Sequence, residues 1–359
     1  MKLVFWQPIP SFHQEAFLNA LAVTDWVDSV QLYYEEELTQ ARIDDGWPLP
    51  NFQGVQARPI SRGEVPSDEA EQAHFFTGFK THPIVWQVFD RMRNVRQSAC
   101  YALTEAPALY GWRRLPREIL YRKRAISLSG RLDGLLAIGR KAEVFYQSIL
   151  KGATPVYPFA YYDASNTNIP ERPALERRDK VHLLYVGRLI HLKGIDRLLR
   201  ACAKLTRVEP DWHLTILGDG PEEGHLKHLA SKLGIGNYLE WKSALPAAEV
   251  SKIYHEADIL IQPSRGDGWG MTVVEALRHG CEVIATHACG AAVAAHPSKR
   301  LSSNWRDWVS VLREQIQSGP LTDNQRAANQ KRALAYCAEE GVARLKTIVE
   351  ARPPDVRTR

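Results

Sequence analysis

The sequence has little cysteine, and its few cysteines follow no recognisable pattern. There are five among 359 residues, an odd number whose spacing matches neither a zinc-binding motif nor a disulfide framework. We therefore expect free thiols, as in proteins of a reducing compartment. Clusters of residues at metal-ligand spacing are also lacking, so we expect no metal. The cysteines are Cys100, Cys202, Cys281, Cys289 and Cys337.

Long apolar runs are lacking too. No stretch approaches the roughly 20 residues that a membrane-spanning helix needs. The N-terminal "MKLVFWQPIP" is too short, and too soon interrupted by proline, to be a signal peptide. The sequence thus predicts a cytoplasmic protein. Hydrophobic residues make up 45% and charged residues 24%, which allows two domains of ordinary size with a core each.

Acidic residues are scarce in one basic stretch, from Arg91 to Arg124, where only Glu105 and Glu118 oppose nine cations. Such a stretch fits an anionic membrane surface, a phosphorylated substrate or nucleic acid, and it fits a solvated helix face equally well. Nucleic-acid-binding motifs are missing, so we do not expect that partner. The nine cations are Arg91, Arg93, Arg96, Arg113, Arg114, Arg117, Arg122, Lys123 and Arg124.

Short apolar runs alternate with helical patterns along most of the chain, beginning with "KLVFW". This alternation favours parallel sheets with helices on both faces. Between Pro155 and Arg178 proline, asparagine and charge accumulate, as in a linker. The alternation then restarts and ends near Ala295. The two segments that follow, "NWRDWVSVLREQIQ" and "NQRAANQKRALAYCAEEGVARLKTIVE", each predict one helix, before a disordered tail.

The organisation predicts an α/β fold with two Rossmann-like, doubly wound domains that face a central cleft. We expect the first domain over residues 1–165 and the second over residues 166–325. Residues 326–359 are predicted to form a C-terminal helix, which could pack back on the first domain, and a tail. Open α/β sheets bind ligands outside the carboxyl ends of their strands, so the cleft is the expected site.

Two cations follow a predicted strand in "VGRLIHLKG". Arg188 comes directly after the glycine that ends the strand, and Lys193 comes five residues later, before a helix. The arginine guanidinium can donate hydrogen bonds to two oxygens at once, and the lysine ammonium adds a localised positive charge, so this pair suits a diphosphate. Cations are unfavourable at the start of a helix, which favours a functional interpretation over two ordinary surface charges.

Two acids flank a glycine-rich turn in "SRGDGWGMTVVE". Gly268 and Gly270 allow backbone to approach a ligand closely, and the helix that follows presents unpaired N–H groups to an anion. Glu275 lies in an apolar context, where a carboxylate needs hydrogen-bond donors such as a vicinal diol. Asp267 can reach another hydroxylated group. A capping aspartate and a salt-bridged glutamate would fit this fragment equally well.

The segments "YVGRLIHLKG", "LTILGDGP", "YHEADILIQPSRGDGWGMTVVEALRHG" and "VIATHACGAA" follow one another in this order. Together they resemble the retaining glycosyltransferases of family 4, which have the GT-B fold. The resemblance runs from about Val181 to Ala292. The N-terminal half is similar to the family only in its alternation of strands and helices.

The resemblance implies a role for each matching position. Arg188 and Lys193 would bind the diphosphate of a nucleotide sugar, Glu275 its ribose hydroxyls, and Asp267 the donor sugar. Family members usually have glutamate at the first acid of the Glu-x7-Glu motif, so Asp267 is one methylene shorter. Asp267, Arg188 and Lys193 are therefore expected to be catalytic. The expected donor-binding residues are Arg188, Lys193, Gly268, Trp269, Gly270, Met271, Thr272 and Glu275.

The N-terminal half departs from the family pattern. The segment after the first predicted strand is "QPIPSFHQ", whereas the family often has a glycine-rich loop there. Many members place a histidine near the cleft, and here the strand "ACYALTE" ends with Glu105. Glu105 is thus a further catalytic candidate. His13 and Glu105 are the candidates for binding the acceptor, although His13 also fits an ordinary residue at a helix start.

The function implied by the resemblance is retaining, metal-independent transfer of a hexose. The donor would be a nucleoside diphosphate sugar, and the acceptor a saccharide or lipid-linked saccharide of surface polysaccharide or lipopolysaccharide synthesis. No other cofactor is implied. The segment from Arg113 to Arg124 would allow peripheral contact with the anionic inner face of the cell membrane. Two alternatives stay open: a non-catalytic nucleotide-sugar-binding partner of another transferase, and another GT-B enzyme such as a sugar-nucleotide epimerase.

Overall fold

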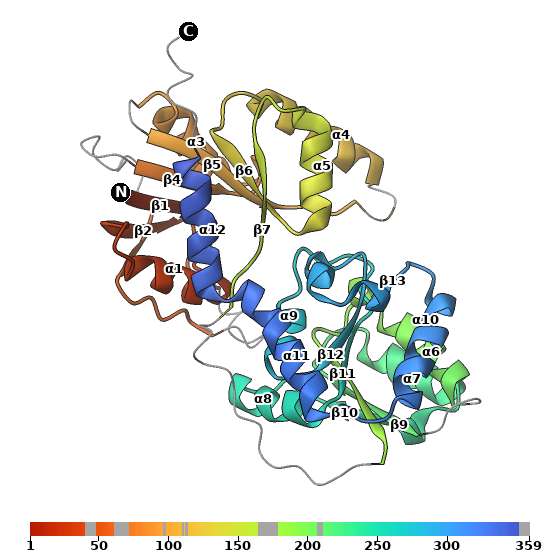
Figure 1. Cartoon of the computed structure of the whole chain (residues 1–359). Coiled ribbons are helices and arrows are strands. Elements are labelled where there is room, and N and C mark those ends of the chain that lie inside the picture. The colour runs from red at the N-terminus through yellow and green to blue at the C-terminus, as the bar shows by residue number, and fades with distance from the viewer. Residues whose placement is uncertain are drawn as a thin grey trace. The chain divides into compact units, whose positions relative to one another are not determined.

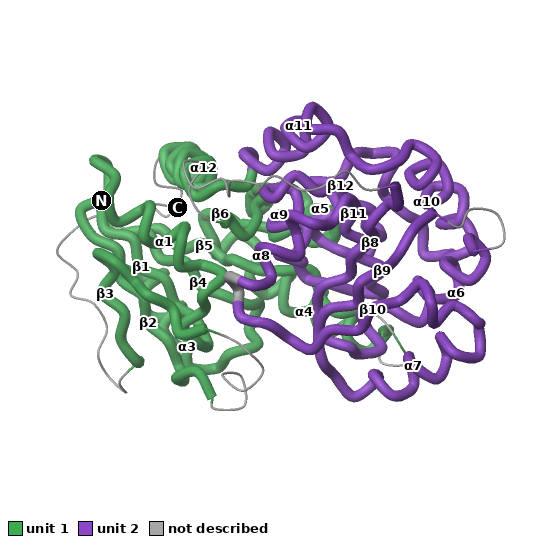
Figure 2. The backbone as a smooth tube through the Cα atoms, turned by 90° about the horizontal axis from the view of Figure 1, so that it is seen from below, with its two compact units in different colours: residues 1–166, 336–359 green, residues 167–335 purple. Residues whose placement is uncertain are grey.

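The computed structural model describes residues 1–39, 48–60, 72–95, 98–109, 111, 114–163, 179–206 and 211–351. The chain divides into two compact units, which Figure 2 shows in separate colours. Unit 1 comprises residues 1–166 and 336–359, and unit 2 comprises residues 167–335. Each unit has a parallel sheet and a hydrophobic core of its own.

Unit 1 is built on a seven-stranded sheet in the order β3-β2-β1-β4-β5-β6-β7. All neighbouring strands pair in parallel. β1, β4 and β5 lie inside the sheet and are buried along most of their length, so their sequences are nearly continuous apolar runs. The strands are β1 Lys2–Gln7, β2 Ser29–Tyr34, β3 Val55–Pro59, β4 Gln72–Thr77, β5 Ser98–Glu105, β6 Gly134–Ile138 and β7 Val156–Phe159.

Helices from both ends of the chain cover this sheet. α12 is the last helix of the chain and packs beside α1, the first, as the blue and red helices of Figure 1 show. Gly341 allows this close packing, because a Cβ there would lie only 2.6 Å from the Tyr162 ring and 3.0 Å from the Phe17 ring. The helices are α1 Glu15–Ala22, α3 Pro83–Met92, α4 Arg114–Leu128, α5 Arg140–Leu150 and α12 Ala338–Glu350.

Unit 2 repeats the architecture on a six-stranded sheet in the order β10-β9-β8-β11-β12-β13, with all pairs parallel. The strands are β8 Val181–Val186, β9 Trp212–Leu217, β10 Leu239–Lys242, β11 Ile259–Gln262, β12 Glu282–Thr286 and β13 Arg300–Leu301. The helices are α6 Ile195–Leu205, α7 Glu223–Lys232, α8 Ala247–Glu256, α9 Met271–Arg278, α10 Trp308–Gln317 and α11 Asp323–Ala333. The expectation of two Rossmann-like α/β sheets is confirmed.

Two strands lie where the sequence predicted none. β7 belongs to the sheet of unit 1, although we predicted a linker from Pro155 onwards. It is an edge strand, where proline is tolerated because one side of the backbone needs no partner. β13 pairs with β12 beyond Ala295, where strand signals had ended. It has two residues, too few to show a period.

The predicted long C-terminal helix is wrong. It is divided into α11 and α12, with a short 3-10 turn over Leu334–Tyr336 between them. The unit boundary falls at this break, so that α11 belongs to unit 2 and α12 to unit 1 (Figure 2). Each half is held by the unit against which it packs, and this packing overrides a sequence that favours continuous helix.

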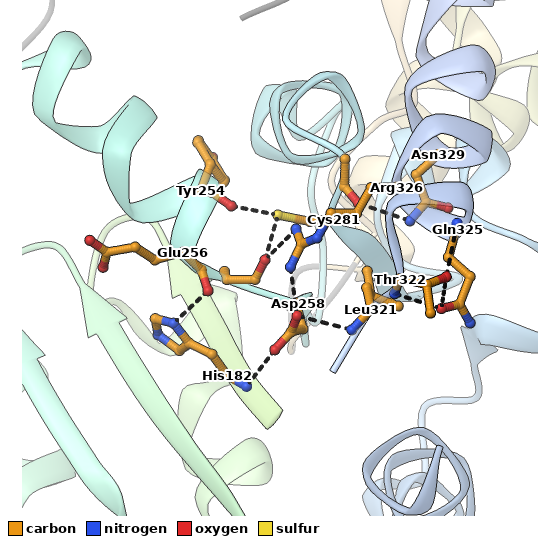
Figure 3. Close-up of polar contacts among 12 residues, drawn as sticks. His182, Tyr254, Glu256, Asp258, Cys281, Leu321, Thr322, Gln325, Arg326 and Asn329 are labelled. Atoms are coloured by element: carbon orange, nitrogen blue, oxygen red, sulfur yellow. Dashed lines mark hydrogen bonds and ion pairs between the residues drawn. The ribbon is translucent and has the colours of Figure 1, made fainter. Parts of the chain in front are cut away.

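A buried ion pair attaches α11 to unit 2, as Figure 3 shows. Arg326 donates to Asp258 Oδ1 at 2.6 Å and to the Ala257 carbonyl at 2.9 Å. The other oxygen of Asp258 accepts from the backbone N–H of His182 at 2.9 Å. Asp258 is 1% and Arg326 4% exposed. Because both charges are buried and hydrogen-bonded, the pair defines where α11 docks.

None of the described helices is long and apolar enough to cross a membrane. All five cysteines lie within the described ranges, where they are buried and form no disulfide. In the basic stretch, Arg96 and Arg113 fall outside the described residues.

Candidate nucleotide-sugar site

The loop after β8 carries the two predicted diphosphate ligands to the carboxyl edge of the unit 2 sheet. It runs through a 3-10 turn, His191–Lys193, and ends at Gly194, whose φ of 72° is left-handed and favours glycine. A Cβ on Gly194 would lie 2.3 Å from the Pro263 carbonyl oxygen, so the loop packs directly on the loop after β11. Arg188 is exposed and forms no ion pair with any described residue.

Arg265 joins these two loops. Its backbone N–H donates to the Leu192 carbonyl at 2.8 Å, and its guanidinium donates to both carboxylate oxygens of Asp196 at 2.7 Å. Burial opposes the charge of Asp196, but the hydrogen bonds and charges of Arg265 and Arg200 lower its pKa to about 2. The carboxylate is therefore ionised at neutral pH, and the bidentate pair holds the two loops in register.

Asp267 is the centre of a small polar cluster. Its Oδ2 accepts from Lys193 Nζ at 2.6 Å, from Gln262 Nε2 at 3.0 Å and from Ser264 Oγ at 3.4 Å. The side chains of Lys193 and Asp267 are 19% and 14% exposed. No described residue donates to Oδ1 of Asp267, so this oxygen is available to a ligand hydroxyl. The predicted diphosphate lysine and the predicted sugar-binding acid thus contact each other.

The glycine-rich turn lies close to the loop after β12. Asp267 and Cys289 form a parallel β-bridge. A Cβ on Gly290 would lie 2.1 Å from the Gly268 carbonyl oxygen, and one on Gly270 would lie 2.7 Å from Cys289 Sγ. The glycines therefore serve packing between loops first, and they leave the backbone of the turn uncovered by side chains.

The N-terminus of α9 offers donors that no described residue uses. Gly270 caps the helix in a left-handed conformation, with φ 93°, and provides no side chain to the first turn. The backbone N–H groups of Met271 and Thr272 donate to no described residue. The Thr272 hydroxyl is buried and also lacks a described partner. A buried hydroxyl beside free N–H groups at a helix N-terminus is suited to bind an anion.

The remaining predicted donor residues differ in exposure. Glu275 is half-buried on α9, and the Tyr254 hydroxyl on α8 donates to its Oε2 at 3.0 Å. The Trp269 side chain is 2% exposed, which leaves its backbone for contact with a donor. Its carbonyl oxygen already accepts from the backbone N–H of Ala291 at 2.8 Å.

The two candidates in unit 1 lie on either side of one tyrosine. Glu105 ends β5 and is hydrogen-bonded to the Tyr161 hydroxyl; burial and the Glu105 charge raise the pKa of Tyr161 well above its usual value. The His13 ring stacks on Tyr161 at 6.5 Å between centroids. Burial lowers the pKa of His13 to about 4, although Asp163 opposes this. The imidazole is therefore neutral at neutral pH.

Sequence reasoning missed several residues that position the predicted ones. Gln262 and Ser264 surround Asp267, Tyr254 supports Glu275, and Tyr161 links the two candidates of unit 1. Gln262 and Ser264 carry a readable signal, because they are polar residues where a buried strand ends. Tyr254 and Tyr161 carry none, since only the folding of distant segments brings them to their partners.

Comparison with known proteins finds a family to which most of unit 2 is similar. Residues 168–332 match the family described as glycosyl transferases group 1. An uncharacterised glycosyltransferase of Haemophilus influenzae is 35% identical over 121 residues, 33% of each chain. A D-inositol 3-phosphate glycosyltransferase of an Arthrobacter species is 33% identical over 159 residues, 42% of this chain and 38% of the relative. The chain thus matches about a third of the length of these curated relatives.

Solved structures match nearly the whole chain. Sucrose-phosphate synthase from Thermosynechococcus elongatus has a TM-score of 0.70 at 13% identity and covers 98% of both chains. The lipopolysaccharide outer core galactosyltransferase WaaB has a TM-score of 0.66 at 15% identity, with 98% of this chain and 100% of that chain covered. These identities show the fold alone. The fold class is GT-B, and residues 168–332 of its second unit are similar to the glycosyl transferases group 1 family.

Proposed function

We propose that the protein is a retaining glycosyltransferase of family 4. It would transfer a hexose from a nucleoside diphosphate sugar to a saccharide or lipid-linked saccharide in surface polysaccharide synthesis. The Lys193–Asp267 pair beside the free N–H groups and buried hydroxyl at the α9 N-terminus carries the proposal. It sets donors for a diphosphate next to a carboxylate oxygen free for a sugar hydroxyl. A GDP-mannose-dependent mannosyltransferase of Mycolicibacterium smegmatis, 35% identical over 117 residues, is consistent with this.

In the proposed reaction, the bond between C1 of the sugar and the diphosphate oxygen breaks, and its electron pair stays on the diphosphate. Arg188, Lys193 and the α9 N–H groups stabilise the growing negative charge. The acceptor oxygen bonds to C1 on the face that the diphosphate leaves, which retains the configuration. The acceptor proton passes to the departing phosphate. Asp267 orients sugar hydroxyls and forms no bond to C1.

The direct test measures nucleotide release from UDP-, GDP- and dTDP-sugars in the presence of saccharide acceptors. We expect release that depends on the acceptor with one class of donor. Binding without turnover would favour a non-catalytic partner, and conversion of the sugar nucleotide without acceptor would favour an epimerase. A covalent adduct on Asp267, sought by mass spectrometry, would contradict attack on the same face.

Two variants test the assignment of the donor site. We expect Arg188→Ala to weaken nucleoside diphosphate binding about tenfold, as for loss of a charged hydrogen bond. Lys232→Ala, which removes an exposed cation of α7, is the matched control. Glu275→Gln is expected to weaken binding of the ribonucleotide more than that of its 2′-deoxy counterpart, which keeps only the 3′-hydroxyl for the carboxylate. Equal losses with both nucleotides would contradict the ribose role.

α4 supports the peripheral membrane contact that we propose alongside the reaction. Leu115, Ile119 and Ile126 are 69%, 55% and 64% exposed. With Arg122 they recur every three or four residues, so they share one helix face. Only Ala125 and Leu128 of this helix are buried. An exposed apolar face flanked by Arg114, Arg122 and Lys123 suits an anionic lipid surface.

Vesicle sedimentation tests this contact. We expect binding to anionic but not to zwitterionic vesicles. Ile119→Ser with Ile126→Ser should reduce binding several-fold at unchanged stability, since both side chains are exposed. Val144→Ser, an equally exposed change on α5, is the control. Unaltered binding after replacement of Arg114, Arg122 and Lys123 by serine would count against the contact.

A further inference from the structure

In unit 1, Lys80, Arg93 and Arg131 contact one hydroxyl or one carboxylate, and the charge of a fourth cation, Arg124, acts on Lys80. They come from separate segments: Lys80 from the loop between β4 and α3, Arg93 from the end of α3, Arg124 from α4, and Arg131 from the loop after α4. The positions of α3 and α4 in the fold can be followed in Figure 1. The hydroxyl is that of Ser127 and the carboxylate that of Asp90.

Hydrogen bonds connect the members of this cluster. Lys80 Nζ donates to Ser127 Oγ at 3.0 Å, and Ser127 Oγ donates to the Arg124 carbonyl at 2.8 Å. Arg131 donates to Asp90 Oδ1 at 2.6 Å and to the Ser127 carbonyl at 3.2 Å. Arg93 Nε lies 3.6 Å from the same Asp90 oxygen. Two arginines therefore share one carboxylate oxygen.

The positive charge of the cluster is not balanced by the described acids. Lys80 and Arg124 form no ion pair with any described residue, and Asp90 is the acid that pairs with Arg131 and Arg93. Burial lowers the pKa of Lys80, and the charges of Arg131, Arg124 and Arg93 lower it further, against the effect of Asp90. Four cations that share a single carboxylate are stabilised when a further anion binds between them.

The backbone holds Lys80 in place. Its φ of 54° is left-handed, which is unfavourable for a residue with a Cβ. The preceding Phe79 is fully buried and packs on Trp86 and Tyr146, at 6.0 and 5.0 Å between ring centroids. This anchor fixes the loop, so that Lys80 is presented toward Ser127 at the cost of local strain.

We propose that Lys80, Arg124, Arg131 and Ser127 form a binding site for a phosphate group. The arginines and the lysine would supply charged donors to the phosphate oxygens. The Ser127 hydroxyl, which donates to the Arg124 carbonyl in this structure, would turn toward the phosphate and supply a neutral donor. The phosphate could be free or the headgroup of a phosphomonoester lipid. The site requires no step of the proposed glycosyl transfer, so either proposal can fail without the other.

Binding is measured on the full chain with reductively ¹³C-methylated lysines, whose resonances report each ammonium. We expect inorganic phosphate or monomeric dihexanoyl phosphatidic acid to shift the Lys80 resonance and to raise its pKa. Similar affinity for both compounds would identify free phosphate as sufficient, and much tighter binding of the lipid would identify a headgroup. Lys80→Arg identifies the resonance by its loss.

Matched variants separate a site from diffuse attraction. Lys80→Asn keeps a residue that tolerates the left-handed backbone, and Arg124→Gln removes one arginine. We expect each to weaken phosphate binding about tenfold, as followed by calorimetry, at unchanged thermal stability. Lys141→Gln removes an exposed cation of α5 and should have little effect. An equal loss with Lys141→Gln, or no binding of either compound, would overturn the site.

Discussion

Lys193 and Asp267 contact each other at 2.6 Å in the ligand-free chain. Because a donor diphosphate would compete with the Asp267 carboxylate for the lysine, the two proposed roles can be separated. We expect Asp267→Asn to lower kcat at least about a hundredfold while nucleoside diphosphate affinity is kept or increased. Lys193→Met should weaken that affinity by about ten- to a hundredfold. Calorimetry and steady-state kinetics measure both quantities.

A result in which Asp267→Asn weakens the nucleotide as much as Lys193→Met would contradict competition. It would mean that the carboxylate orients Lys193 for the phosphate. Lys232→Met provides the control for loss of a cation from unit 2.

The residues of this site show how far sequence can go. Asp267 and Glu275 could be predicted because a glycine turn and a helix start lie between them in one segment. That Lys193 pairs with Asp267 could not, since the contact joins residues 74 apart. Thr272 was predicted as a donor-binding residue, but that its hydroxyl is buried without a described partner is visible only in the fold.

His74 makes the stability of unit 1 depend on pH. Its Nδ1 accepts from Trp6 Nε1 at 3.1 Å, and burial lowers its pKa from 6.5 to about 4. In the unfolded chain His74 is protonated below about pH 6.5, whereas in the folded chain it stays neutral down to about pH 4. We expect the contribution of His74 to the free energy of unfolding to be complete above pH 6.5. Because of this histidine, the free energy of unfolding should decrease by about 3 kcal/mol as the pH drops to 4.

Urea titrations across this pH range test the slope. His74→Asn keeps an acceptor for Trp6 but does not titrate. The decrease in the free energy of unfolding that His74 causes should therefore disappear. The half-buried His13, whose pKa is also about 4, causes a similar decrease, which should remain in the His74→Asn variant. His225→Asn, on the exposed face of α7, should behave like the parent chain. An unchanged slope in His74→Asn would show that the histidine does not carry the effect.

At the scale of elements, strands buried on both faces were the easiest to predict. β8, β9 and β11 appear in sequence as apolar runs because no face of theirs meets water. β7 was not predicted because its Pro158 lies inside the strand. The break between α11 and α12 was not predicted because the residues on both sides of it favour helix. Tertiary contacts place the two halves in different units, among them the Arg326–Asp258 pair for α11 and the packing of Gly341 for α12.

Gly341 provides a prediction at this scale. Alanine normally favours a helix by up to about 1 kcal/mol over glycine, but a Cβ here would lie 2.6 Å from the buried Tyr162 ring. We expect Gly341→Ala to destabilise the protein by about 1–3 kcal/mol, as in an overpacked core. Gly224→Ala, in α7 with nothing within 4 Å of the added Cβ, should be neutral or stabilising. Thermal unfolding of both variants measures the contrast.

In the whole molecule, unit 1 is discontinuous in sequence, because it is formed by two segments from opposite ends of the chain. Unit 1 contains the first 166 residues and the last 24, and unit 2 lies between them in sequence. The stability of the N-terminal sheet therefore depends on a helix that follows unit 2 in sequence. α12 buries Leu345, Ile348 and Val349, which at roughly 2 kcal/mol each is a substantial part of the stability of one domain.

A chain that ends at Ala335 tests this dependence. We expect unit 2 to keep its fold, because α11 and its ion pair with Asp258 remain. Unit 1 loses the helix that covers Phe17 and Tyr162, so α1 and β1 should exchange their amide hydrogens much faster. Hydrogen exchange read by mass spectrometry compares peptides from β1 with peptides from β11 in both chains. Unchanged protection of α1 would mean that the sheet of unit 1 is stable without α12, whereas loss of protection in β11 would mean that the two units fold only together.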